Sequence, residues 1–209
     1  MIESKAELKF YIWADRIMNG YTTEPSFRSL ICDVLMGGGI KEYLKAMRCY
    51  SYYKRQKGVL SKLMRHFYGF RFRKLGQKLS YSIGEDVFGY GLLIPHYGTI
   101  VVGGSNRIGN FAVLHTSTCI SDKESVIGNG LYLSTGAKIT KGITLGDGVM
   151  ISANSVVNRS FGGNVLIVGT PAREKSQRPI WYLDEHLYDE RVNRIENRWK
   201  LLESNIKSI

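Results

Sequence analysis

The fold is decided by residues 127–157, which read IGNGLYLSTGAKITKGITLGDGVMISANSVV. An aliphatic side chain stands at every sixth position of this stretch: Ile127, Leu133, Ile139, Leu145, Ile151 and Val157. The residue after each of them is small or polar. A period of six matches neither an amphipathic helix nor a strand that alternates between two faces. It predicts a parallel β-helix of hexapeptide repeats, with one aliphatic side chain per face pointing inward.

A second ladder precedes the first and has the same period. It consists of Val102, Ile108, Leu114 and Ile120. Seven residues, rather than six, separate Ile120 from Ile127, and the segment 121–125 between them is polar. We therefore expect a bulge or small loop at 121–125.

The segments on either side of the ladders have helical patterns. Apolar spacing and glycine punctuation predict helices over 6–18, 25–35, 40–56 and 59–79, and another in the tail from residue 177. We expect an N-terminal helical domain at 1–80, a β-helix domain at 81–175 and a C-terminal helical tail at 176–209. Open strand edges need cover, so the N-terminal helices should cap one end of the β-helix. The tail should cap the other end or pack against a neighbouring subunit.

Apolar runs and cysteines indicate the compartment. No stretch reaches the apolar length of a membrane span, and the first residues lack the layout of a secretion signal. We expect a soluble, cytoplasmic protein. The three cysteines, Cys32, Cys49 and Cys119, are widely spaced and have no matching histidine cluster. They predict buried thiols, with neither a disulfide framework nor a metal site.

The net charge of +11 is concentrated in one region. Residues 37–80 hold twelve Lys and Arg and one acid, Glu42. Such a block attracts phosphate-bearing ligands, anionic lipid or nucleic acid. Peripheral contact of the region 41–78 with an anionic membrane is one reading, and a solvated helix face is the other. Aromatic residues in the block have the helical spacing of core residues, so nucleic acid is not the expected partner.

Three motifs resemble the serine acetyltransferase branch of the hexapeptide acyltransferases. They are LLIPHYGTIVVG at 92–103, NRIGN at 106–110 and VGTPAR at 168–173, within a similarity that spans roughly residues 80–175. The resemblance implies a left-handed β-helix that assembles into homotrimers. It also implies acetyl-CoA as cosubstrate, bound along the groove between adjacent prisms, and no metal.

In that family a histidine in the context of the first motif is the general base, and His96 stands at its place. An alcohol is too weak an acid to attack a thioester unless a base takes its proton. His115, one residue after the ladder position Leu114, is the alternative base or a group that binds the acceptor. Alternatively, either histidine has only a structural role, with its ring hydrogen-bonded within a turn.

The sequence departs from the family pattern around the base. Pro95 stands where the family has Asp, Thr99 where it has Gly, and Tyr81 near the place of the Asp that orients the imidazole. Glu85 or Asp86 could take over the orienting role. The family's longer lid is replaced by the short segment 121–125, a loss that affects recognition of serine more than acetyl transfer.

The family's cofactor-binding turns correspond to Gly136-Ala137 and Ala153-Asn154, where small residues let the pantetheine chain approach the backbone. Corners of any hexapeptide coil also hold small residues. Four cations are candidates to pair with the phosphates of CoA, namely Lys138, Lys141, Arg173 and Lys175. Each of them can equally be an ordinary surface charge.

The sequence therefore favours an acetyl-CoA-dependent O-acetyltransferase of the serine acetyltransferase type. Its acceptor would be the hydroxyl of serine or, as the alternative, of a sugar in surface glycan synthesis. A β-helix that only binds a partner, without catalysis, is the second alternative.

Overall fold

The computed structural model describes residues 2–21 and 39–207. Its helices are α1 (Lys5–Met18), α3 (Ile40–Arg55), α4 (Val59–Leu79), the short η1 (Trp181–Leu183) and α5 (His186–Lys207). Three of the predicted N-terminal helices, at 6–18, 40–56 and 59–79, are confirmed to within one residue. The helix predicted over 25–35 and Cys32 lie outside the described residues. Within the described ranges no helix is long and apolar enough to cross a membrane.

Short strands follow α4 and form three sheets. The strands are β1 (Tyr81–Ile83), β2 (Ile100–Val102), β3 (Arg107–Ile108), β4 (Val113–Leu114), β5 (Thr118–Ile120), β6 (Val126–Ile127), β7 (Tyr132–Leu133), β8 (Lys138–Ile139), β9 (Thr144–Leu145), β10 (Met150–Ile151), β11 (Val156–Val157), β12 (Val165–Gly169) and β13 (Ala172–Gln177). Sheet 1 has the order β1-β2-β5-β8-β11, sheet 2 β3-β6-β9 and sheet 3 β13-β12-β10-β7-β4.

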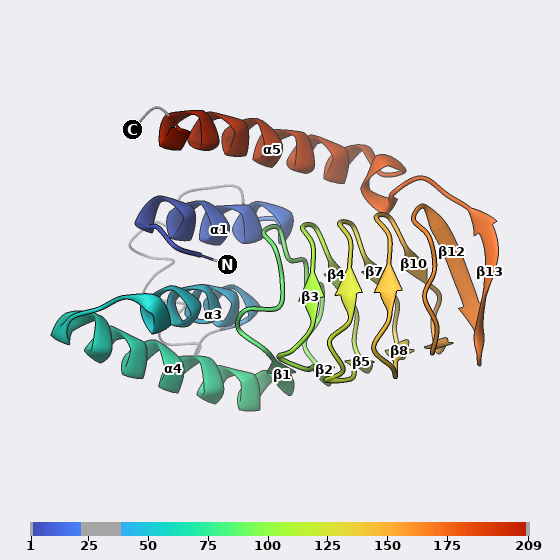
Figure 1. The fold of residues 1–209 in the computed structure, drawn as a ribbon, viewed down its shortest axis with the longest axis horizontal. Helices are drawn as coiled ribbons and strands as arrows, with labels where there is room; N and C mark the ends of the chain where they lie inside the picture. The colour runs from blue at the N-terminus through green and yellow to red at the C-terminus, as the bar shows by residue number, and fades with distance from the viewer. Residues whose placement is uncertain (1, 22–38, 208–209) are drawn as a thin grey trace.

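From β2 to β11 the strands alternate regularly among the three sheets, so the chain winds around a three-sided prism (Figure 1). All neighbouring strands pair in parallel except β12 and β13, which form a closing antiparallel hairpin. The predicted parallel β-helix is therefore confirmed.

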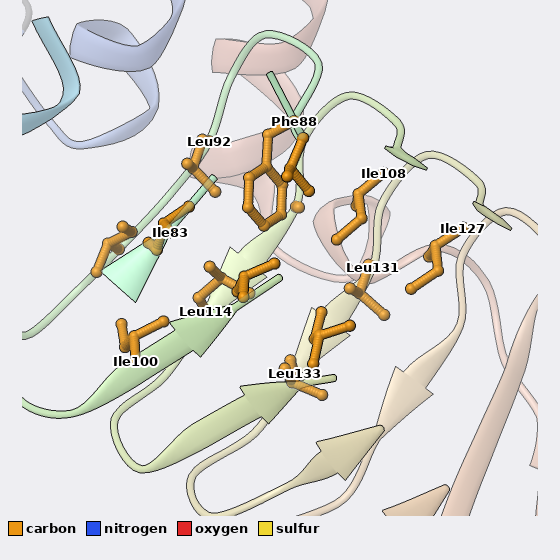
Figure 2. Close-up of a cluster of buried hydrophobic side chains, with 14 of the residues drawn as sticks. Ile83, Phe88, Leu92, Ile100, Ile108, Leu114, Ile127, Leu131 and Leu133 are labelled. Carbon is orange, nitrogen blue, oxygen red and sulfur yellow. The ribbon is translucent and has the colours of Figure 1, made fainter. Parts of the chain in front are cut away.

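The aliphatic ladders of the sequence form the interior of the prism. Figure 2 shows Ile108 and Ile127 in one stack and Leu114 and Leu133 in another, with side chains pointing into the same core. The ladder residues from Val102 to Val157 are at most 4% exposed. Ile120 and its partner on the next coil, Ile139, are 19 residues apart in sequence, whereas Ile139 and its partner Val157 are 18 apart. The extra residue lies in the predicted loop at 121–125.

The N-terminal helices close one end of the prism, as predicted. Tyr43 of α3 and Leu75 and Leu79 of α4 belong to the same buried cluster as Tyr81 and Ile83 of the first strand. Helix α4 ends at Leu79, and Ser80, in the left-handed conformation, turns the chain into β1. The helices thus continue the core of the β-helix instead of forming a separate core.

The C-terminal tail takes a path that the sequence did not predict. Helix α5 runs back from the far end of the prism towards α1 (Figure 1). The Trp181 ring nitrogen donates to the Phe111 carbonyl oxygen (3.2 Å), and the Tyr90 hydroxyl donates to Glu196 (3.0 Å). The expectation that the tail caps the other end is therefore wrong, whereas its packing on a neighbouring subunit stays a prediction. Aromatic side chains on the outer face of sheet 3 need cover, and the tail provides it.

One buried ion pair joins the helices to the first coil. Arg48 of α3 and Asp15 of α1 are 1% and 2% exposed. The Arg48 guanidinium donates to both Asp15 carboxylate oxygens (2.8 and 3.2 Å) and to the carbonyl oxygens of Phe88 and Gly89 (2.8 and 2.6 Å). Asp15 also accepts from the backbone N–H of Leu92 (3.0 Å). The pair therefore sets the position of α1 and α3 relative to residues 88–92.

Removing one partner of this pair should be costly. We expect Arg48→Met to lower the free energy of unfolding by about 3–5 kcal/mol, because it leaves a buried carboxylate and two carbonyl groups without their donors. The matched control is Lys54→Met on the same helix, which breaks the exposed Lys54–Glu85 pair and should cost about 0–1 kcal/mol. Urea unfolding followed by circular dichroism measures both. Equal losses in the two variants would contradict this account.

Candidate functional site

The candidate site lies along one edge of the prism, where the chain turns from sheet 3 to sheet 1. We call this edge the histidine corner and define it as residues 94–99, 115–117, 134–137 and 152–155. We include the β12–β13 hairpin turn at 170–171, because the Thr170 hydroxyl donates to the Asn154 carbonyl oxygen (3.2 Å). Its turns stack through backbone hydrogen bonds from Ser117 N to Thr99 O (2.7 Å), Gly136 N to Thr116 O (3.0 Å) and Asn154 N to Thr135 O (2.9 Å). His96, His115 and the predicted cofactor-binding turns therefore lie on the same edge.

His96 is exposed in the first turn of the corner. The turn is held at its backbone, because the hydroxyl of the buried Tyr81 donates to the His96 carbonyl oxygen (2.8 Å) and the Gly98 N–H donates to the Leu79 carbonyl oxygen (3.2 Å). Within the described ranges the His96 imidazole makes no hydrogen bond inside the protomer. The ring is thus open to a ligand or to another protomer.

His115 lies in the next turn of the corner and is half-buried. Its Nε2 atom and the Tyr132 hydroxyl share a hydrogen bond of 2.9 Å. Burial lowers the pKa of His115 below the ordinary histidine value, and positive charge on the nearby His96 is a second, smaller cause. The two imidazoles are therefore close enough to influence each other, and His115 favours its neutral form.

The expected carboxylate partner of the base is not found at Glu85 or Asp86. Glu85 pairs with Lys54 (2.7 Å), and Asp86 pairs with Arg55 (2.8 Å) and accepts from the Ser51 hydroxyl (2.6 Å). Both carboxylates lie between β1 and the Phe88 bridge, at the edge that leads from sheet 1 to sheet 2. The suggestion that they orient His96 is wrong for the protomer, because the cations of α3 hold them at a different edge.

The predicted pantetheine-binding residues differ in what they can offer. Ala153 and Asn154 are exposed on the corner. Gly136 is buried at φ +74°, and a side chain there would collide with the Asn154 amide. Ala137 is 0% exposed, and both of its backbone polar groups are hydrogen-bonded. Gly136 and Ala137 are therefore small because of packing within the prism, and only Ala153 and Asn154 offer side chains to a ligand.

Three of the candidate cations adjoin the corner or follow it. Lys138 is exposed and donates to the Gly136 carbonyl oxygen (2.9 Å). Arg173 and Lys175 are exposed on β13, which begins directly after the last turn of the corner. Lys141 lies in the turn between β8 and β9, at the edge from sheet 1 to sheet 2, and is therefore not part of this site.

Tyr132 is a site residue that the sequence reading missed. It precedes the ladder residue Leu133, so its side chain points outward, and it pairs in register with Val113 one coil earlier. The repeat alone places Tyr132 beside Val113 of the preceding coil, and therefore places its ring near His115, two residues further along. Tyr132 also lies 5.9 Å from Trp181, between ring centroids, which links the corner to the tail.

Metal ligands do not gather in the described parts of the chain. No group of three His, Cys, Asp or Glu side chains there could hold a metal ion. Cys49 is buried, and burial raises the pKa of its thiol to about 11. A thiol of such high pKa is a poor nucleophile and metal ligand.

The chain is similar in sequence to serine acetyltransferases. It is 30% identical over 113 residues to the serine acetyltransferase of Buchnera aphidicola. The matched residues cover 50% of this chain and 41% of that relative. The chain is 24% identical over 200 residues to the serine acetyltransferase of Bacillus pumilus, and this match covers 90% of this chain and 88% of the relative. The chain thus matches less than half of the length of the first relative. No family model matches the chain.

The fold is similar to that of solved serine acetyltransferases. The structure from Brucella abortus strain S19 has a TM-score of 0.61 at 22% identity, over 83% of this chain and 71% of that one. A serine acetyltransferase in complex with CoA has a TM-score of 0.55 at 20% identity, over 80% and 68%. These likenesses concern the fold, and they confirm the predicted left-handed β-helix and the resemblance on which it was based.

The proximity of the two histidines can be tested by titration. In NMR spectra of the imidazole rings we expect His115 to titrate below the ordinary value of about 6.5, because burial disfavours its charged form. His96→Gln removes the nearby positive charge and should raise the pKa of His115 part of the way back. The control His66→Gln, on the exposed face of α4, should leave it unchanged. A His115 pKa at or above the ordinary value would contradict the described environment.

Proposed function

We propose that this protein is an acetyl-CoA-dependent O-acetyltransferase of the serine acetyltransferase type. The observation that carries the proposal is the exposed His96, in a turn that matches the family's motif, beside a second histidine on an edge lined by the family's cofactor-binding turns. Similarity to serine acetyltransferases in sequence and in fold supports it. We place the enzyme in the cytoplasm, with the three parts 1–80, 81–175 and 176–209.

His96 acts as general base in this proposal. Its neutral imidazole takes the proton of the acceptor hydroxyl while the oxygen attacks the carbonyl carbon of the acetyl thioester. The imidazolium then returns the proton to the sulfur that leaves, so that acetylated acceptor and free CoA result. Because the His96 ring has no partner within the described protomer, the group that orients it is the acceptor or a neighbouring subunit. A homotrimer, with the histidine corner in the cleft between prisms, would supply such a neighbour.

His115 is the second candidate for the base. Its depressed pKa keeps the imidazole neutral near physiological pH, which is the state a base needs. The hydrogen bond with Tyr132 fixes the ring, as an orienting partner would. In the leading assignment His115 binds the acceptor hydroxyl or keeps the site polar, and His96 moves the proton.

CoA would lie along the histidine corner. Ala153 and Asn154 would contact the pantetheine chain, while Gly136 and Ala137 keep the neighbouring coil close-packed beneath it. Lys138, Arg173 and Lys175 are exposed cations that could pair with the phosphates. That a solved serine acetyltransferase of similar fold is in complex with CoA supports CoA as the ligand of this proposal.

The acceptor is serine or a sugar hydroxyl. The names of the relatives favour serine. The loop at 121–125 favours a larger acceptor, because it is short and lies at the edge between sheet 1 and sheet 2, away from the histidine corner of the same protomer. There it is bonded to the neighbouring turn: the Ser105 N–H donates to Asp122 (2.7 Å), and the Glu124 N–H donates to the Ser105 hydroxyl (3.0 Å). A site without a lid leaves room for an oligosaccharide.

Replacing the base tests the mechanism. We expect His96→Asn to lower kcat/KM for acetyl transfer by about 10²–10⁴, the usual contribution of a general base, while assembly and folding remain intact. His115→Asn should lower it less, and His66→Asn, on α4, should have no effect. Thiol release from acetyl-CoA measures the rates, and light scattering measures the assembly. A larger loss in His115→Asn than in His96→Asn would move the base to His115.

The acceptor can be identified by the same assay. We expect thiol release from acetyl-CoA with millimolar serine. Release only with nucleotide sugars or oligosaccharides would establish the sugar O-acetyltransferase. Absence of release with every acceptor, together with salt-sensitive binding to a macromolecule, would support the non-catalytic binding module.

A further inference from the structure

We propose that the outer face of α4 docks this protein onto membranes that contain anionic phospholipid. Helix α4 is the outermost element on its side of the molecule, and one of its faces packs on α3 (Figure 1). The other face has no cover in the described structure. The proposal depends on this helix alone and does not require the acetyl transfer proposed above.

Five apolar side chains form a stripe on the outer face of α4. They are Val59, Leu60, Leu63, Phe67 and Phe70, and they are 52–88% exposed. At about 100° per residue they fall within roughly one quarter of the helix circumference. The buried residues of α4, such as Phe72 and Leu75, lie on the opposite side and belong to the core. A contiguous exposed stripe of this kind marks an interaction surface rather than scattered surface residues.

The charges around the stripe are all positive. Helix α4 contains six Lys and Arg and no acidic residue. Lys62, Arg73 and Lys74 are exposed beside or directly beyond the apolar stripe, and Lys57 is exposed just before the helix. Aliphatic and aromatic side chains flanked by cations are typical of helices that lie in the plane of a membrane surface. Each cation adds attraction to the negative leaflet.

A membrane fits this surface better than the other occupants. Two copies of α4 facing each other would place cations against cations with no acidic residue to pair them, which disfavours self-association. A nucleic acid would leave Val59, Leu60 and Leu63 without partners, because aliphatic side chains do not stack on bases as aromatic rings do. Acyl chains accept apolar side chains of any shape, and anionic headgroups match the cations.

Docking through α4 would hold the histidine corner near the membrane. The last residue of α4, Leu79, accepts a hydrogen bond from Gly98 in the turn that carries His96 (3.2 Å). The helix is about 31 Å long at 1.5 Å per residue, and its apolar stripe occupies the part remote from β1. The turn of His96 therefore adjoins the end of α4 that lies away from the stripe, and a membrane-anchored acceptor would extend past this end to meet the corner.

Vesicle sedimentation tests the proposal. We expect the full-length protein to bind vesicles of phosphatidylcholine and phosphatidylserine in a ratio of about 4:1, and vesicles of phosphatidylcholine alone much more weakly. Leu63→Glu combined with Phe67→Glu should weaken binding by about a hundredfold. Lys62→Gln, Arg73→Gln and Lys74→Gln together should weaken it by a similar factor, at about fivefold for each cation.

Matched controls carry the same changes elsewhere. Leu187→Glu with Leu201→Glu alters exposed leucines of α5, and Lys5→Gln, Lys9→Gln and Lys200→Gln remove three other exposed cations. Both controls should bind as the parent protein does, and circular dichroism verifies folding of all variants. Absence of vesicle binding by the parent protein, or equal loss in the controls, would overturn the proposal. Two other results would also overturn it. A variant with Leu63→Glu and Phe67→Glu that forms a smaller oligomer than the parent protein would assign the face to a second copy of the chain. Binding of RNA in place of vesicles would assign it to nucleic acid.

Discussion

Burial of one aliphatic side chain on each face of every coil is the constraint on which the structure depends. Ile120, Ile139 and Val157 stack along one face at 0% exposure, and the other two faces repeat the arrangement. Each such side chain stabilises the fold by about 1.5–3 kcal/mol. A slip of one residue would turn an aliphatic side chain outward, so the register of the strands is kept while the turns between them vary in length. The extra residue at 121–125 is tolerated because it lies in a turn between strands.

The parallel pairing of successive coils places residues in columns, and the candidate site is one of these columns. His96 and His115 occupy successive turns of one edge because the chain returns to that edge once per coil. The helical part sets the start of the column. Arg48 and Asp15 hold α1 and α3 on residues 88–92, and Leu79 at the end of α4 bonds to the turn of His96. Packing far from the site thus decides where the exposed imidazole stands.

The sequence predicted the features that repeat. The ladders predicted the β-helix and the loop at 121–125, and the change of composition near Tyr81 predicted where the strands begin. The resemblance of residues 92–103 to a known motif directed attention to His96. These signals are local, so they can be read without knowing which coils face each other.

Features that depend on contacts between distant segments could not be read in the same way. The small size of Gly136 suggested space for a ligand, whereas the side chain of Asn154 one coil later occupies that space. Glu85 and Asp86 were candidates because of their proximity in sequence, yet the cations of α3 bind them. The tail returned along sheet 3 because aromatic residues from several coils combine into one apolar face. The hydrogen bond between Tyr132 and His115 could have been predicted from the sequence, because Tyr132 pairs with Val113 one coil earlier, close to His115.

The most direct test of the central claim is a crystal structure of the protein with CoA bound. The account predicts that the pantetheine chain follows the histidine corner past Ala153 and Asn154, and that the sulfur ends within hydrogen-bond reach of the His96 imidazole or of an acceptor held by it. CoA bound at either of the other two edges of the prism, or a sulfur remote from both His96 and His115, would contradict it.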